Sequence, residues 1–140
     1  MSRLVTRPQT LVEEFIRSWS LGLEDFCASV SARFTAETVW ENVGYSVTTG
    51  AEDNIAHLRE SAGRLGWSTV DVDTVAIATA GDTVLTERVD HHLAPDGRVL
   101  FSVRCASAFD VAGERITGIR EYFDTAPLVA ARDRAAMVAD

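Results

Sequence analysis

Charged and polar side chains recur at alternate positions in stretches of this sequence that otherwise have the pattern of buried strands. In Thr83–Leu93 (TVLTERVDHHL), Arg88, Asp90 and His92 fall on one face, because side chains alternate between the two faces of a strand. Positions two apart on one face are roughly 7 Å apart, which lets the fork of an arginine reach a neighbouring carboxylate. The segment therefore predicts a paired cation and anion with a histidine beside them.

Two other strand-like stretches add polar groups of the kind that acid–base chemistry needs. Ile119, Glu121 and Phe123 share a face, so a carboxylate stands between two apolar neighbours. Trp40 and Asn42 share a face in the run TVWEN. If these faces line one pocket, it holds two carboxylates bridged by a cation, and carboxylates in different surroundings can serve as acid and base.

Each of these groups also has a plain structural interpretation. An Arg–Asp pair on a strand is often a surface pair, and Glu121 can face solvent at a sheet edge. Asn42 can cap a turn before Gly44, and Trp40 can be part of the core. Only convergence on one pocket would distinguish a site from these roles.

Other kinds of site are not indicated by the sequence. His91 and His92 are adjacent on a strand and point to opposite faces, so they cannot chelate one ion together. His57 has no HExxH partner, and there is no calcium loop, glycine-rich phosphate loop or GxSxG motif. The absence of lysine excludes Schiff-base chemistry. We therefore expect no metal.

Helical patterns occupy the first half of the chain and strand patterns the second. Apolar residues recur at helical spacing after a capping box at Thr10–Glu13, and again over Leu23–Phe34 and Glu52–Leu65. A further helix begins near Thr125. The strand-like segments are 38–42, 67–80, 83–93, 97–110 and 114–124, and short turns join the last four. We expect one α+β domain over residues 1–140, with helices over the concave face of a strongly curved sheet and a cavity between them.

Composition and charge exclude several classes of protein. The 140 residues suit one domain, and 46% hydrophobic with 24% charged residues is typical of a globular chain. Thirteen basic against 21 acidic residues give a net charge of −8, which argues against nucleic-acid binding. No signal-like apolar region or membrane-length apolar run occurs, and Cys27 and Cys105 are expected to be free thiols, so we expect a cytoplasmic protein without membrane contact.

The residues in these segments resemble the limonene-1,2-epoxide hydrolase family, within the larger group of NTF2-like and SnoaL-like domains. The resembling stretches are WENVG, TERVD and, roughly thirty residues later, ITGIREYFD, and the likeness extends over nearly the whole chain. The resemblance implies an NTF2-like cone with a mixed or antiparallel sheet. It also implies a homodimer without metal or cofactor, and direct attack of water on an epoxide without a covalent ester.

The resemblance also implies roles for five residues. Arg88 bridges two carboxylates, of which Glu121 is the base and Asp90 the acid. Asn42 and Trp40 stand at the positions that hold the water. The family has Asp where this chain has Glu121 and Tyr where it has Trp40, so the base lies one methylene further out and the ring keeps a donor but no acceptor. The indole has three open roles: it fills space, donates to the water, or closes the water position.

The substrate is expected to be a small or medium apolar epoxide, or a related polyketide-like or terpenoid-like ligand. His92 stands where the family usually has an apolar residue, which indicates a somewhat more polar or differently shaped ligand. The residues expected in the pocket wall are Ile16, Trp19, Leu65, Trp67, His92, Val103, Cys105 and Phe123.

Two alternatives to the hydrolase are a ketosteroid-isomerase-like isomerase or cyclase and a ligand-binding module without activity. Asn42 with Arg88 favours the hydrolase, because both are useful for holding a water. The outer face of the sheet, with Leu85, Val89 and Ile77, is the expected homodimer surface.

Overall fold

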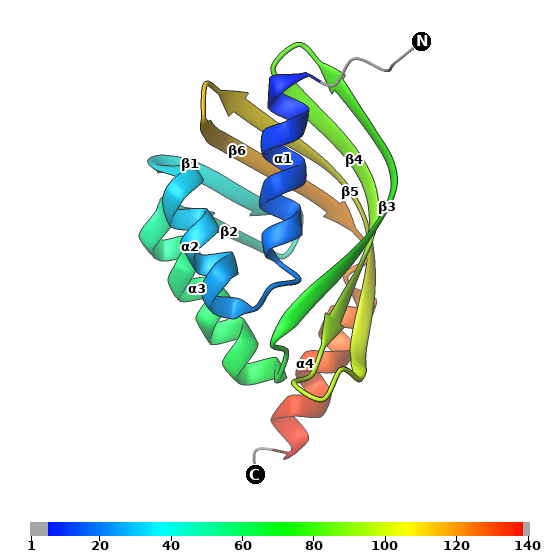
Figure 1. The fold of residues 1–140 in the computed structure, drawn as a ribbon. Coiled ribbons are helices and arrows are strands. Elements are labelled where there is room, and N and C mark those ends of the chain that lie inside the picture. Colours follow the sequence, from blue (N-terminus) through cyan, green and yellow to red (C-terminus); the bar gives the residue numbers. More distant parts are fainter. Residues whose placement is uncertain (1–5, 139–140) are drawn as a thin grey trace.

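The computed structural model describes residues 6–138, which fold around a strongly bent six-stranded sheet (Figure 1). Across the sheet the strands are β2 (Ser46–Thr49), β1 (Phe34–Asn42), β6 (Arg115–Phe123), β5 (Val99–Ala112), β4 (Thr83–Leu93) and β3 (Thr69–Ala80). β1 and β6 are parallel neighbours and the other pairs are antiparallel. The predicted α+β fold with a mixed, curved sheet is confirmed; residues 1–5 and 139–140 of the predicted 1–140 domain lie outside the described residues.

Three helices pack on the concave side of the sheet and a fourth packs at its end (Figure 1). They are α1 (Arg7–Ser18), α2 (Leu23–Arg33), α3 (Ala51–Leu65) and α4 (Ala126–Val138), the last of which contacts β5 and α3. None of the helices within residues 6–138 combines the length and the apolar character that crossing a lipid bilayer requires.

Aromatic rings fill the space between α1, α2 and the concave face. Phe15 of α1 is fully buried and lies at the centre of this cluster. Its ring centroid is 5.5–6.4 Å from those of Trp19, Phe26, Phe34, Trp40 and Phe109. Rings at such separations add favourable edge contacts to the free energy of burial. This cluster fixes α1 and α2 against β1 and β5, which carry part of the polar cluster described below.

The first helix begins three residues before the predicted capping box. Thr6 is the N-cap and accepts a hydrogen bond from the N–H of Gln9 at 3.3 Å. Pro8 lies in the first turn, where a helix does not need its N–H. Thr10, the predicted cap, instead donates its hydroxyl to the carbonyl of Thr6 at 3.3 Å. The predicted start was wrong because proline was assumed to lie outside the helix.

Strand alternation predicts that Val99, Phe101, Val103 and Cys105 share one apolar face of β5, and this is correct for three of the four residues. Phe101, Val103 and Cys105 are buried and line the cavity described below, whereas Val99 is 52% exposed. The pairing of β5 with β4 shifts register between His92 and Leu93. This irregularity inserts one extra residue and turns Val99 away from the cavity.

Candidate active site

A cavity of about 290 Å³ lies between the concave face of the sheet, α3 and α4. Seven of the eight residues expected in the pocket wall line it: Trp19, Leu65, Trp67, His92, Val103, Cys105 and Phe123. Ile16 does not. It is buried beside Val72 and Ile77, on the side of α1 that faces β3. Helical spacing predicted the burial of Ile16, but α1 has more than one buried direction, and this residue points along the other.

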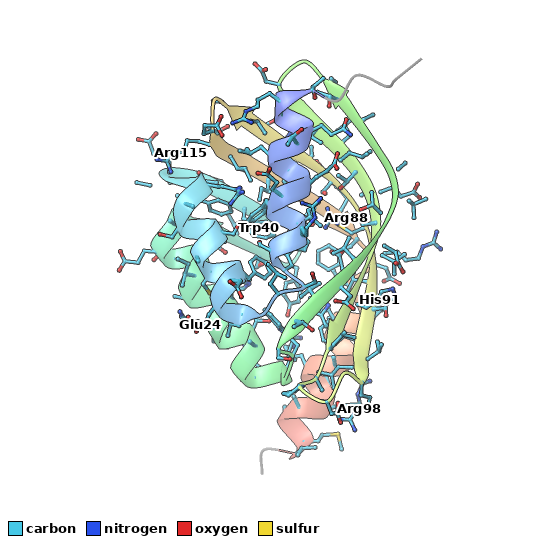
Figure 2. All side chains as sticks on the ribbon, viewed as in Figure 1. Glu24, Trp40, Arg88, His91, Arg98 and Arg115 are labelled. Atoms are coloured by element: carbon cyan, nitrogen blue, oxygen red, sulfur yellow. The ribbon has the colours of Figure 1, made fainter. Side chains whose placement is uncertain are left out.

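Arg88 is buried at 1% exposure, and each of its five N–H bonds has a protein acceptor. Nε and Nη2 donate to the two oxygens of Asp90 at 3.0 and 2.9 Å, and Nη2 also donates to Oε2 of Glu121. Nη1 donates to Oγ1 of Thr86 at 2.8 Å and to the hydroxyl of Ser107. The guanidinium therefore joins the two carboxylates, as predicted, and has no N–H left for a ligand. Figure 2 shows Arg88 and Trp40 inside the molecule, whereas Glu24 and Arg98 project from its surface.

Thr86 and Ser107 were not predicted as part of this cluster. They are directly opposite each other across β4 and β5, and their hydroxyls are 2.8 Å apart. Thr86 lies two residues before Arg88 on the same strand face, so parity alone would have found it. The place of Ser107 in the cluster could not be predicted, because it depends on the register between β4 and β5, which the sequence does not reveal.

The surroundings of Arg88 keep it charged. Burial by itself would lower the pKa of Arg88, but the charges of Glu121 and Asp90 outweigh burial and raise the pKa above its usual value. The guanidinium carbon also lies 5.2 Å from the ring centroid of Trp19 and 5.7 Å from that of Phe109. Both aromatic faces attract a cation.

Glu121 lies on β6 between Ile119 and Phe123 and is buried, as the strand pattern predicted. The indole N–H of Trp40 donates to Oε1 at 2.7 Å. Oε2 accepts from Arg88 and from the thiol of Cys105, whose sulfur is 3.3 Å away. The N–H of Trp40 is therefore bound to the carboxylate, which is none of the three roles considered for it.

Asn42 ends β1 and lines the same cavity. It is opposite Glu121 in the parallel pairing of β1 with β6, so the two side chains are neighbours on adjacent strands. Its Nδ2 donates to Oγ of Ser46 at 3.0 Å, which leaves the amide oxygen as the group that can accept a hydrogen bond. The backbone carbonyl of Asn42 accepts from the N–H of Tyr45 at 2.8 Å. Asn42 thus serves both the turn and the cavity.

One group of residues has the atoms of a metal site. The ligand atoms of Asp90, Cys105 and Glu121 all lie within 4.8 Å of one another. Nη2 of Arg88, however, contacts an atom of each of the three. A divalent ion would have to displace a buried cation from this position, so these residues form an ion-pair cluster and do not fit a metal.

His91 and His92 point to opposite faces of β4, as predicted. His91 bonds to Ser102 and Asp73 away from the cavity. His92 lines the cavity, stacks on Phe101 at 4.3 Å between ring centroids, and lies edge-on to Trp67. Burial lowers the pKa of His92 from its usual value of 6.5 to about 4, so the ring is neutral at neutral pH.

This shifted pKa makes stability depend on pH. Between pH 6.5 and 4 the unfolded chain binds a proton at His92 that the folded protein does not, so stability falls as the pH falls through this range. The loss approaches about 3 kcal/mol near pH 4. His92→Phe keeps a stacked ring but cannot titrate, and we expect its stability curve to be flatter by this amount. Urea unfolding at a series of pH values measures it, and parallel curves for the two proteins would contradict it.

The polar part of the cavity wall could not be recognised from the sequence. α3 presents five polar side chains to it, beside the predicted apolar stripe of the same helix: Asn54, His57, Glu60, Ser61 and Arg64. Arg132 of α4 lines the opposite part of the wall, with its guanidinium carbon 5.8 Å from the ring centroid of Tyr45. The cavity therefore joins an aromatic part next to the carboxylates to a polar part bounded by two helices.

The fold around this cavity is NTF2-like and SnoaL-like. An NTF2-like protein from Anabaena variabilis has the same fold, with a TM-score of 0.69 at 17% identity over 91% of this chain and 96% of that one. A SnoaL-like structure also matches, with a TM-score of 0.74.

The family follows from more specific similarities. The model of the limonene-1,2-epoxide hydrolase catalytic domain matches residues 6–134. Epoxide hydrolase EphG of Mycobacterium tuberculosis is 38% identical over 113 residues, which are 81% of this chain and 70% of that protein. The structure of an LEH-like epoxide hydrolase from M. tuberculosis matches with a TM-score of 0.71 at 27% identity, covering 98% of this chain and 92% of that one. The chain belongs to the limonene-1,2-epoxide hydrolase family, a family of epoxide hydrolases.

Proposed function

We propose that the protein opens an epoxide in a single step, by attack of a water molecule that Glu121 deprotonates while Asp90 protonates the leaving oxygen. The observation that carries the proposal is the buried guanidinium of Arg88, which holds both carboxylates at the wall of one cavity. Two carboxylates whose oxygens lie within 4.8 Å of each other can share a single proton, because like charges so close disfavour ionisation of both.

The base side of the reaction uses Glu121 and Asn42. A nucleophilic water is held best when acceptors take both of its hydrogens. The Glu121 carboxylate supplies one acceptor and the free amide oxygen of Asn42 supplies the other. Trp40 acts through Glu121, because its N–H donates to Oε1 and holds the longer side chain in place.

The acid side uses Asp90. The water oxygen bonds to an epoxide carbon, the carbon–oxygen bond opposite breaks, and the electron pair of that bond stays on the leaving oxygen. Protonated Asp90 gives this oxygen its proton, and the product is a vicinal diol. Glu121 then holds the proton taken from water and Asp90 is ionised, so a proton must return to Asp90 before the next turnover.

The amide oxygen of Asn42 favours the hydrolase over an isomerase, whereas Arg88, expected to help hold the water, has no N–H left for either reaction. An isomerase acting on a ketone needs a donor for the oxygen that becomes an oxyanion. Every N–H of Arg88 is already bound to Asp90, Glu121, Thr86 or Ser107. Asn42, in contrast, has the free acceptor that a water needs.

The expected substrate is a small or medium epoxide with a flat apolar body. A cavity of about 290 Å³ with the rings of Trp19, Trp40 and Trp67 in its wall suits such a molecule. Neutral His92 adds a polar nitrogen close to Asp90, in agreement with a ligand that carries a hydrogen-bonding group.

A single-turnover reaction in oxygen-18 water tests the proposal. With enzyme in excess over a panel of small epoxides, we expect the first diol formed to carry the label, because water attacks directly. A covalent ester would instead deliver unlabelled oxygen from a carboxylate in the first turnover. Unlabelled first-turnover diol would overturn the one-step route, and no diol above the buffer rate would overturn the hydrolase.

The protein is also proposed to be a homodimer that associates through the outer face of the sheet. Leu85 is 46% exposed and Val89 half-buried on that face of β4, and Tyr122 is exposed on β6. Ile77, expected there, is instead on the inner face beside Thr86, because β3 shifts register between Thr74 and Ala76.

Light scattering at micromolar concentration measures the oligomer. We expect a mass of twice 15.2 kDa for the unmodified chain and a shift towards 15.2 kDa for Leu85→Glu, which places charge on the apolar face. If the unmodified protein is a monomer at every micromolar concentration measured, the result would contradict the proposal.

A further inference from the structure

The thiol of Cys105 contacts the proposed base, Glu121. Cys105 lies on β5, lines the cavity, and is 5% exposed. Its sulfur is 3.3 Å from Oε2 of Glu121 and 3.5 Å from Nη2 of Arg88. Cys27 of α2 is equally buried, at 3% exposed, but it does not line the cavity and its thiol has no hydrogen-bond partner within residues 6–138. Cys105 is therefore the residue to test, and Cys27 is its matched control.

The thiol of Cys105 is in the form that can donate. Burial raises the pKa of Cys105 well above its usual value, and the nearby charge of Glu121 raises it further. The sulfur therefore keeps its proton at neutral pH. A neutral thiol is also a poor nucleophile, which suits a side chain in a cavity that receives an electrophilic epoxide.

A count of donors on Glu121 shows what this hydrogen bond does. A carboxylate offers about two lone-pair sites on each oxygen. Oε2 accepts from Arg88 and from Cys105, so its sites are filled. Among residues 6–138, Oε1 accepts only from Trp40, so it keeps one site.

We propose that Cys105 is a positioning residue for the base: its S–H bond to Oε2 fixes the carboxylate of Glu121 and leaves Oε1 to take the proton of water. This inference rests on the proposed function for the role of Glu121 as the base, whereas the contact between Cys105 and Glu121 does not depend on it.

Several charged groups face Glu121 and enter any measurement of its titration. Arg88 and Asp90 come from β4, and both are in its immediate surroundings. The remaining titratable or charged residues that line the cavity are His57, Glu60 and Arg64 of α3, His92 of β4 and Arg132 of α4. Arg88, Arg64 and Arg132 stay charged below pH 9, so their charge does not vary in the tests below.

Infrared spectroscopy tests the contact without any substrate. The S–H stretch absorbs where amide and carboxylate bands do not, and subtraction of the spectra of Cys105→Ala and Cys27→Ala assigns one band to each thiol. We expect the Cys105 band at the lower frequency, because its proton is shared with a carboxylate. It should move up when acid protonates Glu121, and it should also move in Glu121→Gln, while the Cys27 band stays fixed.

Two results would overturn the proposal. One is a Cys105 band that coincides with the Cys27 band and does not respond to pH or to Glu121→Gln. The other is the absence of an S–H band from Cys105, which would show a thiolate. These spectra need no turnover. They therefore decide whether the thiol binds Glu121 even if the protein hydrolyses none of the epoxides tested.

The kinetic test compares a variant that keeps the donor with one that loses it. We expect Cys105→Ala to lower kcat/KM about tenfold, because the carboxylate of Glu121 loses a donor that holds it in place. Cys105→Ser keeps an O–H donor and should restore most of the activity, and Cys27→Ala should leave it unchanged. If serine and alanine behave alike while both proteins melt normally, Cys105 only fills space and the proposal fails.

Discussion

Glu121→Gln and Asp90→Asn are each expected to reduce epoxide turnover by about 10²–10⁴-fold while the protein stays folded. Both substitutions keep the size of the side chain and an oxygen that accepts from Arg88. Glutamine at position 121 cannot take the proton of water, and asparagine at position 90 cannot give one to the leaving oxygen. Each variant therefore removes one proton transfer, together with one of the hydrogen bonds that the carboxylate accepts.

The measurement is diol formation under saturating epoxide, with circular dichroism and thermal unfolding to verify the fold. Asp110→Asn is the matched control, because Asp110 is an ion-paired acid on the same sheet, bonded to Arg120 at 2.6 Å and outside the cavity. We expect the control to turn over epoxide at the unmodified rate. Unchanged turnover in Glu121→Gln would show that another group is the base. Asp124, the next acid in the chain, is a poor substitute, since it is exposed and caps α4 through the N–H of Ala126.

The strand pattern predicted which side chains share a face, and this is why the centre of the site could be recognised. Alternation on β4 placed Arg88, Asp90 and His92 together, and alternation on β6 placed Glu121 with its apolar neighbours. These faces are fixed by local geometry, since short turns set where each strand begins. The convergence of the faces on one cavity required the fold.

Contacts between strands that are distant in the sequence could not be predicted in this way. The bond between Trp40 and Glu121 depends on the parallel pairing of β1 with β6, which no turn connects. The irregularities that expose Val99 and turn Ile77 inward insert single residues, and these leave no mark in an apolar pattern. The resemblance places Trp40 at a position that holds the water, whereas in the structure its N–H donates to the proposed base, Glu121.

Arg88→Met is expected to destabilise the protein by about 3–5 kcal/mol at neutral pH, because it leaves two buried carboxylates without their cation. Methionine fits beside Trp19 and Phe109, so the loss comes chiefly from charge. The pKa of Arg88 is raised, so this group stays charged in the unmodified protein at every pH used. The carboxylates and the neighbouring His92 can therefore change the result with pH, and the loss should shrink in acid, where the carboxylates are protonated. Urea unfolding at neutral and acidic pH measures both effects.

Removal of all three charges separates stability from chemistry. In Arg88→Met with Asp90→Asn and Glu121→Gln no charge remains in the cluster, and we expect most of the stability lost in Arg88→Met to return. Activity should not return, because the triple variant has neither base nor acid. A triple variant as unstable as Arg88→Met would mean that the shape of the guanidinium and its bonds to Thr86 and Ser107 hold the sheet together. Recovery of stability without activity would instead show that the fold does not need the charged groups at this cavity, since a neutral filling supports it equally well.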